Sequence, residues 1–144
     1  MPVRKASAVW EGDLKNGKGK ARGESGEFEV SLSFKSRFEE ERGSNPEELV
    51  GAAHAGCFSM ALAHGIATRG LSPRRIKTTA EVSLDKTDNG FKISRIILNT
   101  EAEVPDMSDD EFQDEALRAK KNCPVSKALA GVEIGLAARL KKSS

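Results

Sequence analysis

The chain is poor in aromatic residues and in cysteine: its 144 residues include no tyrosine, one tryptophan and two cysteines. The core must therefore be built largely from small aliphatic side chains. A chain of this length is expected to form a single domain over residues 1–144. Acidic and basic residues nearly balance, at a net charge of +1, and both signs are mixed along the sequence. Because a clustered basic face is missing, we expect no nucleic acid as a partner.

We also expect neither a signal peptide nor a membrane-spanning segment. Residues 1–5 are not followed by the apolar stretch of a secretory signal peptide. The most apolar run, residues 50–67, is rich in glycine and alanine and is interrupted by polar residues, so we expect no membrane span. These observations predict a cytoplasmic protein. In a reducing cytoplasm, two thiols are expected to cycle between redox states instead of forming a permanent disulfide.

Alternation and turn signals predict strands in the N-terminal third. The Asn16-Gly17 pair is typical of a hairpin turn, because both residues tolerate positive φ, and short strands over 6–10 and 18–22 would flank it. Residues 27–34 alternate between apolar and polar side chains, which predicts a half-buried strand. The charged segment 35–43 is expected to be a loop.

A helix-start signal precedes the apolar run. Asn45 can cap the helix, Pro46 suits its first position, and Glu48 completes a capping box. We expect the helix to run to about Thr68, where a glycine that follows closely ends it. Because the helix has no polar stripe, we expect it to be enclosed on most sides.

The rest of the chain predicts a hairpin, two helices and a closing strand. Residues 76–84 and 91–104 alternate around a turn, and a phase shift near Ser94 indicates a bulge. A capping box beginning at Ser108 opens an amphipathic helix, after which a short helix and a final alternating segment follow. The predicted fold class is α+β: antiparallel sheets with a long buried central helix and a second helix.

The two cysteines occupy different helical positions. Cys57 lies in the middle of the long helix, and Cys123 precedes Pro124 at the entrance of the short one. Core filling is one explanation, because free cysteine is among the most buried residue types. Cys57 lies about 16 Å along the axis from the helix start, so the helix dipole cannot lower its pKa and another cation must do so. Local rules alone would make Cys123, beside two lysines, the more acidic thiol.

Residues 45–60, together with the NCPVS sequence at 122–126, resemble the OsmC/Ohr family of thiol peroxidases. The resemblance spans nearly the whole chain, and residues 82–86 with Phe38 after Arg37 resemble the OsmC branch. It implies an intertwined homodimer with two active sites at its interface. It also implies an antioxidant enzyme of the stress response that reduces organic hydroperoxides, with hydrogen peroxide as a further candidate substrate. No metal or organic cofactor is implied, because sulfur carries the electrons.

The resemblance further implies the roles of four residues. Cys57 corresponds to the peroxidatic thiol and Cys123 to the resolving thiol, so a sulfenic acid on Cys57 would condense to a Cys57–Cys123 disulfide. Arg37 corresponds to the arginine that activates the thiolate, and Glu47 to the acid that holds this arginine. Arg42 is the alternative activating cation. An external dithiol, for which a lipoyl protein is a candidate, would reduce the disulfide.

Two other classes of function compete at this stage. The first is a small-molecule binding or stress-interaction module on the same scaffold, without peroxidase activity. The second is a zinc site, and with it a metal-dependent hydrolase; its candidate ligands are His54, Cys57, His64 and Cys123. Because no C-x2-C motif is present, the sequence favours helix-packing histidines.

The spacing of Glu47 and Cys57 predicts how subunits assemble. Ten residues on one helix correspond to about 15 Å of rise and about 80° of rotation. One arginine cannot easily pair with Glu47 and also touch the Cys57 sulfur, unless the helix breaks or the two residues belong to different subunits. No proline lies between them, so a break is not expected. We therefore expect each active site to be completed across a two-fold interface, with the small-residue helices packed at the dimer centre.

Overall fold

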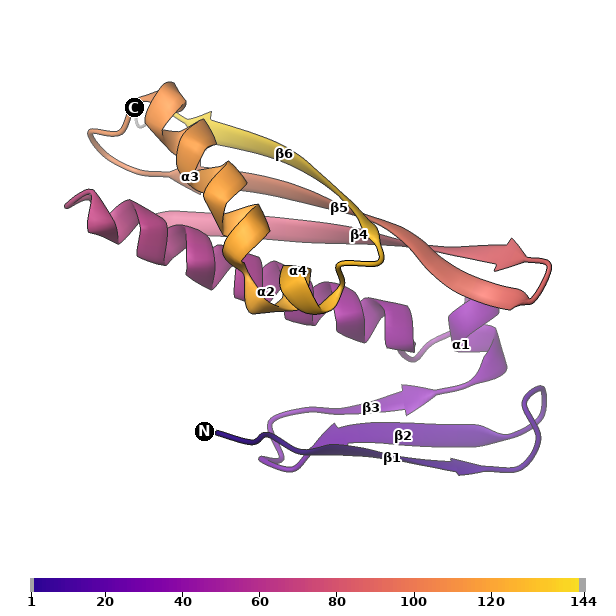
Figure 1. Cartoon of the computed structure of the whole chain (residues 1–144). Helices are drawn as coiled ribbons and strands as arrows, with labels where there is room; N and C mark the ends of the chain where they lie inside the picture. The colour runs from indigo at the N-terminus through magenta and orange to yellow at the C-terminus, as the bar shows by residue number, and fades with distance from the viewer. Residues whose placement is uncertain (1, 143–144) are drawn as a thin grey trace. The chain divides into compact units, whose positions relative to one another are not determined.

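The computed structural model describes residues 2–142, which form six strands and four helices (Figure 1). The chain divides into two compact units, the first ending at Leu49 and the second beginning at Val50. Each unit is described by itself. The expectation of a single domain over the whole chain stays a prediction.

The first unit is built on a three-stranded antiparallel sheet in the order β1-β2-β3. Its strands are β1 (Ala6–Glu11), β2 (Lys18–Gly23) and β3 (Glu29–Leu32). The predicted hairpin is confirmed, with Glu11 opposite Lys18 at the turn. No residue described in this unit belongs to the hydrophobic core of the chain, so the sheet has no core of its own.

A one-turn helix, α1 (Phe34–Phe38), follows β3. The prediction of a loop over 35–43 is therefore wrong for its first residues, and β3 ends earlier than predicted. The reason is a capping box: the Ser33 hydroxyl accepts a hydrogen bond from the Ser36 amide, and the Ser36 hydroxyl accepts one from the Ser33 amide. The alternating pattern, which includes Phe34, hides this signal.

The long helix, α2 (Pro46–Thr68), has the predicted bounds and runs without a break. Asn45 Oδ1 accepts a hydrogen bond from the Glu48 amide at 2.7 Å, which confirms the cap. The Glu48 carboxylate accepts a hydrogen bond from the Ser44 hydroxyl at 2.6 Å. This contact ties the start of the helix to the segment before it.

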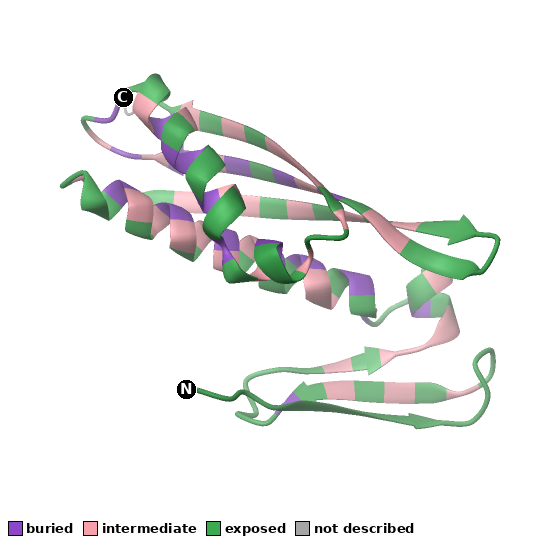
Figure 2. Cartoon of the chain, in the orientation of Figure 1, coloured by how far each residue is buried: buried purple, intermediate pink, exposed green. Residues whose placement is uncertain are grey.

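Only one face of α2 is buried within the chain (Figure 2). Its fully buried side chains follow helical spacing: His54, Phe58, Leu62 and Ile66. On another face Met60 is 76% exposed. The expectation of a helix enclosed on most sides is thus not met by the single chain, because periodicity cannot distinguish burial in one chain from burial in an assembly.

By length and composition alone α2 could cross a membrane, a criterion that the core helix of a soluble protein also meets. The buried face, however, includes Phe58, Leu62 and Ile66, which are members of the hydrophobic core. A helix whose apolar stripe packs into a core is typical of soluble proteins.

The second unit contains a sheet of β4 (Arg75–Thr87), β5 (Gly90–Glu103) and β6 (Glu133–Lys141) in that order. β4 and β5 form the predicted antiparallel hairpin. Its register shifts between Ser83 and Leu84, opposite Ser94, which confirms the bulge. β6, however, runs parallel to β5, a departure from the expected all-antiparallel pairing. Parallel neighbours need a crossover connection, which the two intervening helices supply.

These helices are α3 (Asp109–Asn122) and α4 (Pro124–Ala128). The capping box that opens α3 is confirmed, with the Ser108 hydroxyl accepting from the Glu111 amide at 3.2 Å. Side chains of α2, α3 and the sheet together form the core. Its fully buried members include Phe58, Leu62, Ile66, Ile96, Leu98, Phe112 and Cys123.

A close contact between α2 and α3 explains a glycine in the last turn of α2. A Cβ added at Gly65 would collide with the Glu115 carboxylate, which is 4% exposed and paired with Arg69 Nε at 3.1 Å. Any side chain at this position must therefore displace a buried, ion-paired carboxylate.

We expect Gly65→Ala to lower the free energy of unfolding by about 1–3 kcal/mol, as overpacking does, although alanine favours a helix by about 1 kcal/mol. Urea unfolding would measure the change. In a Glu115→Ala background the same substitution should become neutral or stabilising, because the colliding group is gone. An equal loss in both backgrounds would contradict the steric explanation.

Candidate thiol site

The second unit brings the two cysteines together. Cys57 lies in the middle of α2. Cys123 is both the C-cap residue of α3 and the N-cap residue of α4. Both are free thiols; Cys57 is partly buried and Cys123 fully buried. Their side chains lie within hydrogen-bonding reach of each other. This proximity is what a disulfide between them would require.

The electrostatic surroundings of the two thiols differ. Burial raises the pKa of Cys57, and the hydrogen bond with Cys123 raises it further. Burial alone would also raise the pKa of Cys123, but hydrogen bonds with Cys57 and with the amide and hydroxyl of Ser126 lower it. Within this unit the negative charge thus belongs on Cys123, as the local rules predicted. Cys57 needs a cation to become the thiolate.

His54 supports this pair from one turn earlier on α2. Its Nε2 lies 2.8 Å from Ser126 Oγ, and both side chains are buried. Nδ1 is buried without a hydrogen-bond partner among the described residues. Burial lowers the pKa of His54, so its ring is neutral at physiological pH. The sequence did not single out Ser126, although its position three residues after Cys123 places it in the first turn of α4.

The zinc alternative finds no support in the arrangement of these side chains. Across residues 2–142, no group of three or more histidine, cysteine and acidic side chains is placed to hold a metal ion. His64 is exposed on α2, whereas His54 contacts a serine hydroxyl. The structure therefore does not gather the four residues that the sequence offered as ligands.

Arg37 and Glu47 form an ion pair within the first unit. Arg37 Nη2 lies 2.7 Å from Glu47 Oε1, and Nε lies 3.1 Å from the same oxygen. Glu47 occupies the first turn of α2, where a carboxylate is favoured, and is 7% exposed. The guanidinium also lies over the Phe38 ring, 5.3 Å from its centroid. The ion pair and this ring contact together fix the position of the guanidinium.

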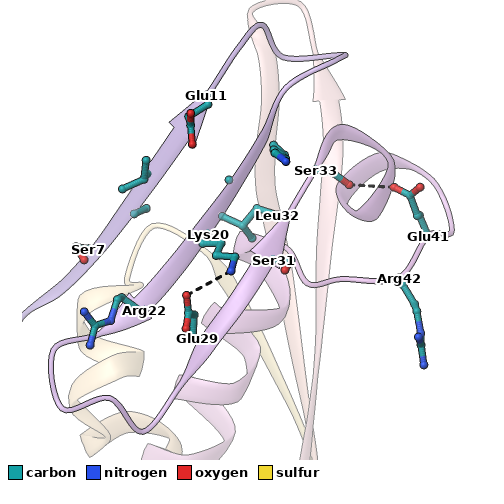
Figure 3. A pocket seen from close by; sticks show the side chains of 14 residues that line it. Ser7, Glu11, Lys20, Arg22, Glu29, Ser31, Leu32, Ser33, Glu41 and Arg42 are labelled. Atoms are coloured by element: carbon teal, nitrogen blue, oxygen red, sulfur yellow. Dashed lines mark hydrogen bonds and ion pairs between the residues drawn. The ribbon is translucent and has the colours of Figure 1, made fainter.

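A cavity of about 630 Å³ lies on one face of the sheet β1-β2-β3 (Figure 3). Half of its lining residues are charged, and Lys20 Nζ lies 3.7 Å from Glu29 Oε1. Arg42, the alternative activating cation, belongs to this lining, whereas Arg37, Glu47 and both cysteines do not. Arg42 is therefore not the arginine held by Glu47.

Two free thiols close to each other on an α+β scaffold are typical of a two-cysteine redox protein. The chain belongs to the OsmC family: the family model described as OsmC-like protein matches residues 38–137. The chain is 49% identical over 139 residues to the peroxiredoxin OsmC of Escherichia coli strain K12, covering 96% of each chain. It is 33% identical over 95 residues to the organic hydroperoxide resistance protein OhrB of Bacillus subtilis, covering 65% of this chain and 67% of OhrB.

Solved structures share the fold. The crystal structure of the same OhrB is 25% identical, with a TM-score of 0.69 over 95% of this chain and 98% of its own. An OsmC-like protein from Mycoplasma pneumoniae is 18% identical, with a TM-score of 0.77 over 98% and 99% of the two chains. The α+β fold class and the resemblance stated from the sequence are confirmed.

The burial of His54 predicts an acid-dependent loss of stability. A histidine whose pKa is lowered by folding binds fewer protons when folded than when unfolded. Its stabilising contribution is therefore full above pH 6.5, the ordinary value, and is lost as the pH falls through the folded-state pKa. Urea unfolding at about pH 7.5 and about pH 5 should show a larger loss for the wild type than for His54→Gln.

His64→Gln is the companion variant, since the chain has two histidines. It separates the contribution of His54 from that of His64. All proteins are compared at one concentration, because assembly contributes to stability. If His54→Gln and the wild type lose the same amount in acid, the buried histidine is not the group responsible.

Proposed function

We propose that the protein is a cysteine-based peroxidase that reduces organic hydroperoxides, with hydrogen peroxide as a further candidate substrate. The observation that carries the proposal is the pair of free thiols, one partly exposed and one buried, within reach of each other. Relatives named peroxiredoxin OsmC and organic hydroperoxide resistance protein support it.

The chemistry follows from the two thiols. The Cys57 thiolate attacks the distal peroxide oxygen, the O–O bond breaks, and the leaving alkoxide takes up a proton to become an alcohol. Cys57 is left as a sulfenic acid. The Cys123 sulfur then attacks the Cys57 sulfur, the S–O bond breaks, and water leaves as the disulfide forms. An external dithiol, with a lipoyl protein as the candidate, reduces this disulfide and completes the cycle.

Access assigns the two roles. Cys123 is 0% exposed, so a hydroperoxide cannot reach its sulfur without local opening, whereas Cys57 is partly accessible. The local electrostatics favour the opposite assignment, because the charge belongs on Cys123 when only this unit is considered. A guanidinium close to Cys57 reverses that preference by stabilising its thiolate. Arg37, held by Glu47, is the cation we assign to this task.

We further propose a homodimer in which Arg37 and Glu47 of one subunit meet Cys57 of the other. The unbroken helix between Glu47 and Cys57 supports it, because one arginine cannot span about 15 Å of rise. The first unit supports it as well. One face of its sheet carries apolar rows, Ala8-Ala21-Val30 and Trp10-Gly19-Leu32, without a core of its own. Such a face, like the exposed side of α2, needs a partner to cover it.

In this proposal the whole chain acts as one domain in the cytoplasm, without nucleic acid or membrane as a partner and without a metal or organic cofactor. The alternative is a binding or stress-interaction module on the same scaffold. Loss of free thiol upon addition of a hydroperoxide distinguishes the two, because a binding module leaves both thiols reduced.

Cys57→Ser should abolish turnover of cumene hydroperoxide with a dithiol donor, because the nucleophile is lost in a nearly isosteric change. Cys123→Ser should still react once and carry one added oxygen on Cys57, measured by mass spectrometry after one equivalent of peroxide. The wild type under the same treatment should show the Cys57–Cys123 disulfide. Undiminished turnover by Cys57→Ser, or a wild type without that disulfide, would refute the mechanism.

Arg37→Ala should slow the reaction of Cys57 with hydroperoxide by roughly a hundredfold or more, because the thiolate and the developing charge lose their cation. Single-turnover kinetics at neutral pH would measure this, and Arg42→Ala is the matched control that should react normally.

Mixing Arg37→Ala with Cys57→Ser under conditions of subunit exchange tests the assembly. A heterodimer with a shared site regains one intact active site, whereas sites confined to single chains would leave the mixture inactive.

A further inference from the structure

The proposed chemistry leaves one buried polar group without a role. His54 is 0% exposed, yet its ring contacts no charged partner and its Nδ1 has no hydrogen-bond partner in the described part of the chain. Burying an imidazole with an unsatisfied nitrogen costs free energy that an apolar side chain would not cost. Its one contact, Nε2 to Ser126 Oγ at 2.8 Å, is therefore the feature to explain.

The proton positions in this contact follow from counting donors. A neutral imidazole carries one N–H, on Nδ1 or on Nε2. A proton on Nδ1 would be a buried donor without an acceptor, which is rare in proteins, whereas a bare Nδ1 is a less costly unsatisfied acceptor. The proton therefore lies on Nε2, and His54 donates to Ser126 Oγ. Because the Ser126 oxygen accepts this bond, its own hydrogen is directed elsewhere.

Cys123 is the group that can receive this hydrogen. Ser126 lies in the first turn of α4, three residues after Cys123, which occupies the N-cap position. The hydroxyl and the amide of Ser126 both lower the pKa of Cys123, although the Cys123 side chain makes no capping hydrogen bond in α4. A hydroxyl that is forced to donate stabilises a thiolate and does not stabilise a thiol in the same way.

We infer that His54 is a positioning residue for the resolving step: by donating to Ser126 it directs the Ser126 hydroxyl at Cys123 and favours the Cys123 thiolate that attacks Cys57 sulfenic acid. The step balances, since the Cys123 sulfur supplies the electron pair of the new S–S bond and the departing hydroxide takes up one proton to leave as water. Naming Cys123 as the attacking sulfur rests on the proposed peroxidase function. The hydrogen-bonded chain from His54 to Cys123 does not.

The other titratable groups near Cys123 within this unit are one thiol and three lysines. Cys57 faces it from α2, and Lys120 and Lys121 close α3 just before it, with Lys127 on α4. The Cys57→Ser background removes the first of these, so that Cys123 is the only thiol left. The three lysines are unchanged in every variant compared. Differences in titration then report on His54 and Ser126.

The test is the ultraviolet absorbance of the Cys123 thiolate as a function of pH in the Cys57→Ser background. Ser126→Ala should raise the titration midpoint by roughly one pH unit, the effect of removing one hydrogen bond from a charged acceptor. His54→Leu should raise it as well, because the serine hydroxyl is then free to turn away. The double variant should shift no further than Ser126→Ala alone, since His54 acts through Ser126.

His54→Gln is the second variant, because its side-chain amide can still donate to Ser126 and should keep the midpoint near that of the parent. It also decides the matter if His54→Leu does not fold, as judged by circular dichroism. A midpoint unchanged by Ser126→Ala, or shifts from His54 and Ser126 that add in full, would overturn the inference. The titration needs no turnover, so a protein without peroxidase activity but with these shifts would refute the proposed function alone.

Discussion

The site depends on one long-range contact: the start of α4 meets the middle of α2. His54 and Ser126, 72 residues apart in sequence, are joined there at 2.8 Å, and the same approach brings Cys123 to Cys57. The parallel placement of β6 contributes to it, because α3 and α4 form the crossover between β5 and β6 and must pack across the sheet. A fold with only antiparallel hairpins would not carry Cys123 back to the centre of α2.

This contact also creates an electrostatic conflict. Two thiols so close to each other cannot both ionise easily, so they share one negative charge and titrate as a pair. The dipoles at the start of α4 draw that charge to Cys123, whereas access for a hydroperoxide favours Cys57. The conflict is useful if the preference changes during the cycle. In the proposed cycle, a guanidinium near Cys57 would move the charge there for the first step, and the hydrogen bonds to Cys123 would favour the thiolate there for the second.

Local signals in the sequence predicted most elements, since caps, turns and alternation are encoded within a few residues. The Asn45 cap, the Ser108 box and the bulge at Ser94 are examples. Alternation has no direction, so it could not reveal that β6 is parallel to β5. The resemblance to the OsmC/Ohr family indicated the candidate site residues Cys57, Cys123, Arg37 and Glu47. The contact of His54 with Ser126 was out of reach, because nothing local links two segments 72 residues apart.

The proposed homodimer would explain both the sequence expectation of an enclosed helix and the observed exposure of α2. Composition records where a side chain lies in the functional molecule, which can include a second copy of the chain. An apolar helix with one face in the core and Met60 exposed on another is suited to such an interface. The first unit, a sheet without its own core, has the same requirement. If one partner covers both surfaces, dimer formation also positions the ion pair of Arg37 and Glu47, which lies in the first unit. The activating cation is then supplied by dimer formation, and the reactivity of Cys57 becomes a property of the dimer and not of the folded chain alone.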